Sequence, residues 1–184
     1  HGEMVSIPIA EIEVAGEQEL VRNQALVREA AEHIAPGAPV AEAIAMVARD
    51  HPTADRLLDE TRAMLEELRA FVVDENVASV VSDVRAEVRE TPAFMRWAFA
   101  AMDGPGPFEE VATESFYYVT PVEPEWSPEQ AEEWLSNFNY AALKIISAHE
   151  VYPGHYVHFL RHHHAPSDAA KVFGAYSFWE GWAH

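Results

Sequence analysis

The sequence predicts an α+β fold that is mostly helical, with a small antiparallel β-sheet near the helix that carries the candidate site residues. Up to about residue 80, and again after residue 126, apolar side chains recur every three or four positions, as on one face of a helix. Between these regions the apolar period shortens to two, which is typical of half-buried strands. Because 49% of the 184 residues are hydrophobic, we expect the chain to build a sizeable core.

The first part of the chain, residues 1–80, is expected to be helical after an irregular or strand-like start. In residues 1–16 the apolar side chains of Val5, Ile7 and Ile9 alternate with other residues. Proline and glycine near residues 36–39, and proline at residue 52, mark breaks between helices. The expected helices cover residues 17–34, 40–49 and 54–78.

The second part, residues 81–184, is expected to hold the sheet and the site helices. Residues 84–88 alternate as a half-buried strand, and residues 115–119 form a short aromatic strand. Residues 95–101 fit a strand or, nearly as well, a helix. The glycines and prolines of residues 103–107 predict a turn.

Two helices are expected after the sheet. Ser127, Pro128 and Gln130 form a helix start with a capping box, and the apolar stripe that follows leads to His149. We therefore expect one helix from Ser127 that places His149 on its buried face. A last helix is expected after residues 165–168, with Glu180 on an apolar face.

Composition narrows the range of partners. A net charge of −19 argues against nucleic acid, because a phosphate backbone would be repelled. No apolar run approaches the roughly 20 residues of a membrane span, so no membrane partner is expected. The absence of cysteine excludes thiolate ligands, so any zinc would be held by nitrogen and oxygen. No signal peptide is visible, which favours the cytoplasm, although the chain starts at His1 and its native N-terminus is not visible.

The candidate chemistry lies in His149-Glu150-Val151-Tyr152-Pro153-Gly154-His155 and in the later Glu180. A catalytic zinc takes three protein ligands and leaves one position for water, which a nearby carboxylate then deprotonates. His149, His155 and Glu180 are the candidate ligands. Glu150, next to the first ligand in sequence, is the candidate general base.

The histidine spacing requires a distorted helix. In the H-E-x-x-H motif the histidines are four apart and share a helix face, whereas His149 and His155 are six apart. On a straight helix they would point about 240° apart and could not share a metal. Pro153 cannot continue the helix, and Gly154 accepts backbone conformations that other residues avoid. We therefore predict a bulge or kink at residues 152–154 that returns His155 to the side of His149.

These residues also carry a resemblance. The pair of motifs, HExxPGH at residues 149–155 and EGWA at residues 180–183, resembles the bacterial family of unknown function numbered eight-eight-five. Looser matches lie upstream, at residues 90–92, 104–108 and 117–121. That family is similar to the largely helical, gluzincin-like zinc peptidases of the carboxypeptidase Taq and oligopeptidase type. Its members are longer, so we expect residues 1–184 to be one partial domain, a portion of a longer zincin-like peptidase.

The resemblance implies a zinc metallopeptidase that hydrolyses peptide bonds, with Zn²⁺ on His149, His155 and Glu180 and with Glu150 as base. It also implies that the strand of Tyr117 and Tyr118 lies beside the cleft and holds the peptide substrate by its edge. The alternative is a non-catalytic acidic helical module, a fragment or pseudoenzyme that binds a peptide or partner.

A group of four histidines follows the motif. His158 lies about one turn after His155 and is a candidate partner behind the ligands. With His162, His163 and His164 it could form a second metal site. A solvated helix end, where imidazoles face the last carbonyl groups, explains the group more simply.

Overall fold

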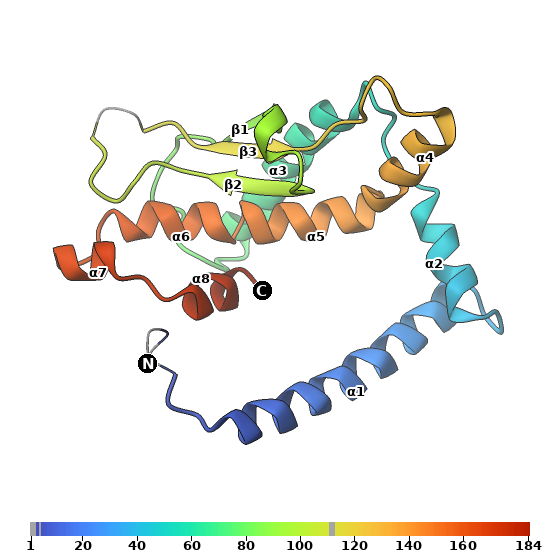
Figure 1. Ribbon diagram of the computed structural model, residues 1–184, viewed down its shortest axis with the longest axis horizontal. Coiled ribbons are helices and arrows are strands. Elements are labelled where there is room, and N and C mark those ends of the chain that lie inside the picture. Colours follow the sequence, from blue (N-terminus) through green and yellow to red (C-terminus); the bar gives the residue numbers. More distant parts are fainter. Residues whose placement is uncertain (1–2, 4, 111–112) are drawn as a thin grey trace. The chain divides into compact units, whose positions relative to one another are not determined.

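The chain folds into two compact units in the computed structural model, His1–Asp50 and His51–His184 (Figure 1). The structure describes residues 3, 5–110 and 113–184. In these residues no helix combines the length and the apolar character needed to cross a membrane.

The first unit is a helical hairpin of α1 (Ile9–Ile34) and α2 (Val40–Ala48). Its small core joins Ala31, Ala35 and Ala43. Gly37 takes a positive φ of 76° in the turn between the helices, a conformation that favours glycine. The strand-like start predicted for residues 1–16 is wrong from Ile9 onward, and residues 1, 2 and 4 of that range lie outside the described residues. Its apolar residues Ile9 and Ile12 are three apart, a spacing that a helix also satisfies.

The second unit contains the sheet and the remaining helices. Its elements, in order, are α3 (Leu57–Asp74), β1 (Glu87–Glu90), η1 (Ala93–Met95), β2 (Ala100–Asp103), β3 (Phe116–Val119), α4 (Pro128–Asn137), α5 (Tyr140–Glu150), α6 (His155–His162), α7 (Asp168–Val172) and α8 (Tyr176–Ala183). The mostly helical α+β class predicted from the sequence is thus confirmed.

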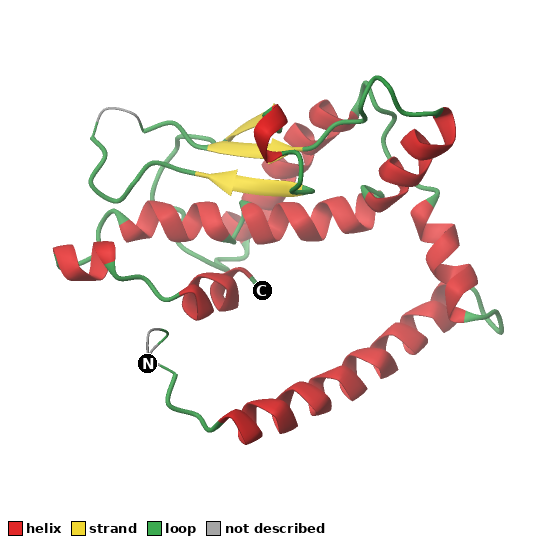
Figure 2. Cartoon of the chain, in the orientation of Figure 1, coloured by secondary structure: helices red, strands yellow, loops and turns green. Residues whose placement is uncertain are grey.

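The sheet has three strands in the order β1-β3-β2 and is mixed (Figure 2). β2 pairs antiparallel with β3, whereas β1 pairs parallel with β3. The prediction of an antiparallel sheet is therefore wrong for the β1 pair. The chain reverses direction between β1 and β2 and again between β2 and β3. After these two reversals, β3 runs in the same direction as β1, and it lies between β1 and β2.

The core lies between this sheet and the helices α3, α5 and α6. β3 turns Tyr117 and Val119 fully into the core, while Phe116 and Tyr118 alternate to its other face. The other buried apolar residues come from α3 (Leu57, Met64, Leu65, Val72), β1 and the residue before it (Val88, Ala86), α4 and its C-cap (Leu135, Phe138), α5 (Leu143) and the segment beyond it (Val151, Tyr152, Tyr156, Val157). This packing holds α5 against the sheet, so that the C-terminal end of α5 is placed with respect to β2.

Two helices predicted as continuous are each divided. The capping box at Ser127 and Gln130 is present, but α4 ends at Asn137 and α5 restarts at Tyr140. The Asn139 side chain accepts a hydrogen bond from the Ala142 N–H and so caps a new helix. Likewise, residues 173–175 separate α7 from α8.

Candidate metal centre

The two histidines of the motif lie on either side of a break between two helices. α5 ends at Glu150 and α6 begins at His155, with a cis peptide bond between Tyr152 and Pro153. The predicted distortion is therefore present. Figure 1 shows α6 continuing along nearly the same line as α5.

The hydrogen bonds of this linker explain how the spacing is corrected. The Gly154 N–H donates to the carbonyl oxygen of Ala148 at 2.9 Å. In an uninterrupted helix that carbonyl would accept from residue 152, four positions on. The chain has thus looped out two residues, and His155 takes the place that residue 153 would hold in a regular helix. Its effective spacing from His149 is four, the spacing of histidines that share a helix face.

Glycine at position 154 is needed for this path. A β-carbon there would lie 1.6 Å from the His149 carbonyl oxygen and 2.6 Å from the Ala148 carbonyl oxygen. Both atoms belong to the backbone and cannot rotate away. The close approach of Gly154 to the end of α5 is what allows α6 to start beside His149.

His149, His155 and Glu180 converge. One potential ligand atom from each lies within 4.8 Å of the others. The Glu180 Oε2 atom is 3.5 Å from His149 Nε2 and 3.7 Å from His155 Nε2. With metal–ligand bonds of about 2.1 Å, two ligands of a tetrahedral zinc lie about 3.4 Å apart. Two imidazole nitrogens and a carboxylate oxygen, at these separations, fit Zn²⁺.

Glu180 is held near the histidines by a contact two residues further along α8. The Trp182 indole N–H donates to the carbonyl oxygens of Pro153, at 2.9 Å, and of Gly154, at 3.3 Å. These carbonyls belong to the linker between the two candidate histidine ligands. Trp182 is 44% exposed and joins α8 to that linker. No signal in the sequence pairs Trp182 with this linker.

Glu150 is anchored to the edge of the sheet. Its Oε2 atom accepts a 2.9 Å hydrogen bond from the Met102 N–H on β2. Burial raises the pKa of this carboxyl group, and the nearby Glu180 adds to the rise, while His149 and the Met102 N–H oppose it. A carboxylate with a raised pKa is a better proton acceptor, as a general base requires. The backbone donor on β2 is a second contact that the sequence did not reveal.

The imidazoles differ in their surroundings. Burial lowers the pKa of His155, which favours the neutral form that binds metals. Phe159 stacks on the His155 ring, with ring centroids 6.0 Å apart. His158 lies behind the site, in contact with the rings of His162, Phe178 and Trp179. Its Nδ1 atom is buried and has no hydrogen-bond partner within the described residues.

Tyr117 and Tyr118 lie on β3, the central strand of the sheet. Tyr117 is fully buried beneath α5, and its hydroxyl is 3.3 Å from the Ser147 Oγ atom. Tyr118 lies on the opposite face of the sheet and stacks on Phe116. Their strand, β3, is paired on both sides and has no free edge to offer a peptide. The edge next to Glu150 belongs to β2 instead.

Comparison with known proteins places the chain in a family. No curated protein matches it. A solved structure from Shewanella oneidensis, described as "a putative lipoprotein of unknown function", matches with a TM-score of 0.83 and 26% identity, over 98% of this chain and 34% of that one. The chain thus spans about a third of the length of that protein. The family profile described as "Bacterial protein of unknown function (DUF885)" matches residues 1–184. The chain therefore belongs to the DUF885 family of bacterial proteins.

Proposed function

We propose that this protein is a zinc-dependent metallopeptidase. The observation that carries the proposal is the convergence of His149, His155 and Glu180 at zinc-ligand separations, with the Glu150 carboxylate beside them on the edge of the sheet. Four residues from three separate elements come together although 25 positions separate His155 from Glu180. A merely structural cluster would not need a second carboxylate anchored beside the first.

The residues of the chain divide the work of peptide hydrolysis. When bound, Zn²⁺ would lower the pKa of a water molecule and polarise the carbonyl group of the substrate. Glu150 takes a proton from water as the water oxygen bonds to the peptide carbonyl carbon. The C–N bond then breaks, and Glu150 passes the proton to the leaving nitrogen. The hydrogen bond from Met102 holds the Glu150 carboxylate in place for both transfers.

The edge of β2 offers a place for the substrate backbone. Met102 turns its N–H away from β3, toward Glu150. Since backbone groups alternate along a strand, those of Ala100 point to the same outer side. A peptide lying along this edge would pair with the outward-facing backbone groups of Ala100 and pass in front of Glu150, while the Met102 N–H stays on the Glu150 carboxylate. This replaces the edge of β3 that the sequence suggested.

Metal analysis tests the proposal first. The purified protein, stripped with a chelator and reloaded with zinc, is expected to hold one zinc ion per chain by mass spectrometry of its metal content. His155→Ala should lose that zinc. The matched control is His164→Ala, which alters an exposed histidine nine positions later. If both variants keep the metal content of the wild type, the ligand assignment is wrong.

Activity is tested with Glu150→Gln, which keeps the shape of the side chain but removes its basicity. This variant should bind zinc like the wild type and cleave peptides about 10² to 10⁴ times more slowly. Cleavage of a mixed peptide library, followed by mass spectrometry, measures the rate. A wild type that binds zinc and cleaves no peptide would favour the non-catalytic binding module. The cytoplasmic location and the lack of nucleic-acid partners stay predictions.

A further inference from the structure

A cavity of about 510 Å³ lies beside the candidate metal centre, and the site described above does not use it. It is bounded by the turn after β2 and by α6, α7 and α8. The lining residues that matter here are Met102, Phe108, Phe159, Val172 and Trp179. This volume falls within the range of about 300–1,000 Å³ that small-molecule and side-chain pockets occupy.

Three residues that line the cavity are neighbours of the candidate centre. Met102 is the residue whose N–H holds Glu150. Phe159 stacks on the His155 ring. Trp179 precedes Glu180 on α8, and its ring meets that of Phe159 with centroids 6.4 Å apart. A chain that lies along β2 past Glu150 would therefore have this cavity directly at its side.

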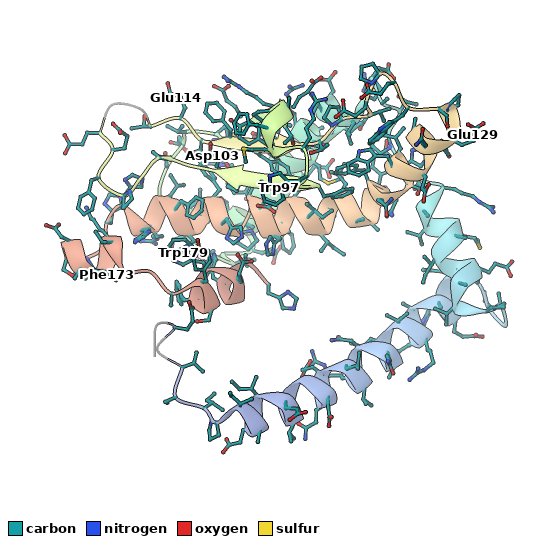
Figure 3. All side chains as sticks on the ribbon, viewed as in Figure 1. Trp97, Asp103, Glu114, Glu129, Phe173 and Trp179 are labelled. Atoms are coloured by element: carbon teal, nitrogen blue, oxygen red, sulfur yellow. The ribbon has the colours of Figure 1, made fainter. Side chains whose placement is uncertain are left out.

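The walls of the cavity are mainly apolar and closely packed. Figure 3 shows Trp179 projecting from α8 toward α6, and Asp103 at the end of β2. Two glycines allow the aromatic rings to approach the backbone. A β-carbon on Gly104 would lie 3.0 Å from the Phe159 ring, and one on Gly174 would lie 2.4 Å from the Trp179 ring. The two rings therefore pack closely against the backbone at Gly104 and Gly174.

Charge does not dominate the lining. Asp103 and Lys171 both border the cavity, and the Lys171 ammonium lies 5.3 Å from the centroid of the Phe108 ring. His162 and His163 also line the cavity, and the remaining walls are mainly apolar and are therefore the main source of selectivity.

We propose that this cavity is the specificity pocket of the enzyme and receives a bulky apolar side chain, above all an aromatic one, from a peptide lying along β2. The assignment rests on the proposed function, because the pocket is defined by its position beside Glu150 and the candidate ligands. A preference of this kind for large over small apolar groups is worth about 10- to 200-fold in the specificity constant.

Binding without chemistry tests the pocket by itself. The probes are N-acetyl-phenylalanine amide and N-acetyl-alanine amide, added to the metal-free protein. The readout is the NMR signal of the Trp179 indole N–H, assigned with Trp179→Phe. The phenylalanine probe should shift this signal and bind at least about ten times more tightly than the alanine probe. Equal binding of the two probes, or an unmoved Trp179 signal, overturns the proposal.

A filled pocket gives the second test. Val172→Trp adds a large ring to an exposed wall residue, and Val77→Trp makes the same change at an exposed residue after α3, away from the cavity. Val172→Trp should lower the affinity for the phenylalanine probe at least about tenfold, and Val77→Trp should leave this affinity unchanged. If the two variants behave alike, the cavity is not the binding site.

Hydrolysis separates the failure of this pocket from the failure of the proposed function. In wild-type protein, peptides with phenylalanine at the position whose side chain enters the cavity should be cut at least about ten times faster than peptides with alanine at that position. Val172→Trp should bring that ratio close to one. Zinc-dependent cleavage with an unchanged ratio would overturn the pocket alone. A zinc-loaded wild type that cuts no peptide would overturn the proposed function and, with it, the assignment of the cavity to a substrate.

Discussion

Replacing Gly154 by alanine tests the linker between the two candidate histidine ligands. The added β-carbon would lie 1.6 Å from the His149 carbonyl oxygen, whereas non-bonded carbon and oxygen atoms normally stay more than about 3 Å apart. The backbone must therefore move by more than about 1 Å. Overpacking of this kind usually costs about 1–3 kcal/mol of unfolding free energy, and a clash with backbone atoms lies at the upper end or beyond.

The same displacement should disturb metal binding. Ligands need to stay within about 0.5 Å of their productive positions, so a shift of His149 against His155 should weaken zinc binding at least about 100-fold. Urea unfolding of the metal-free protein measures the stability loss, and titration against a chelator of known affinity measures zinc binding. Near-ultraviolet circular dichroism shows whether the variant is folded before either value is used.

Gly181→Ala is the matched control, because a β-carbon there meets nothing within 4 Å. Gly181 follows Glu180 within α8, so the control makes the same substitution next to a candidate ligand. Alanine in a helix should stabilise the protein by about 0.5–1 kcal/mol and leave zinc affinity unchanged. A folded Gly154→Ala variant with wild-type stability and zinc affinity would refute the account of the looped-out residues.

Three further predictions concern the supports of the site and the fold. Trp182→Phe removes the indole N–H that bonds to Pro153 and should lower zinc affinity about 10- to 100-fold with little loss of helix content, as measured by chelator competition and circular dichroism. Burial, reinforced by the charges of neighbouring histidines, lowers the pKa of His158 from 6.5 to about 4. The unfolded chain therefore binds more protons between these values, so the stability of the metal-free protein should be full above pH 6.5 and fall, by about 3 kcal/mol, as the pH drops toward 4. His158→Phe should flatten this part of the pH profile, and an unchanged slope in urea titrations would contradict the assignment. Ser127→Ala breaks the capping box with Gln130 and should cost about 1 kcal/mol in the same urea assay.

Local patterns in the sequence were enough to predict most of the helices. Pro36 and Pro39 separate two of them, and Ser127 with Pro128 starts another, because caps and prolines act on their immediate neighbours. Two local signals divide helices that the apolar stripes alone predict as continuous. Asn139 restarts a helix that the apolar stripe alone made continuous, and Gly174 separates the last two helices.

The order and direction of the strands could not be read in the same way. The alternation in residues 115–119 predicts a strand with one buried face, and Tyr117 and Val119 are buried as it requires. Nothing in that alternation says that this strand lies between the other two. Pairing joins residues that are distant in sequence, so a pattern with a period of two fits an edge strand and a central strand equally well.

In the candidate site, too, some features follow from the sequence and others only from the tertiary structure. By itself the sequence determined which residue types are present and that a helix carrying His149 and His155 must be distorted, since proline and glycine act directly on the backbone at 153 and 154. Only the tertiary structure decided how the distortion is used: Gly154 bonds back to Ala148, and two residues loop out. It also decided that Trp182 ties α8 to the linker and that Met102 holds Glu150. These contacts span 28 to 48 positions, and depend on packing between elements that no local spacing encodes.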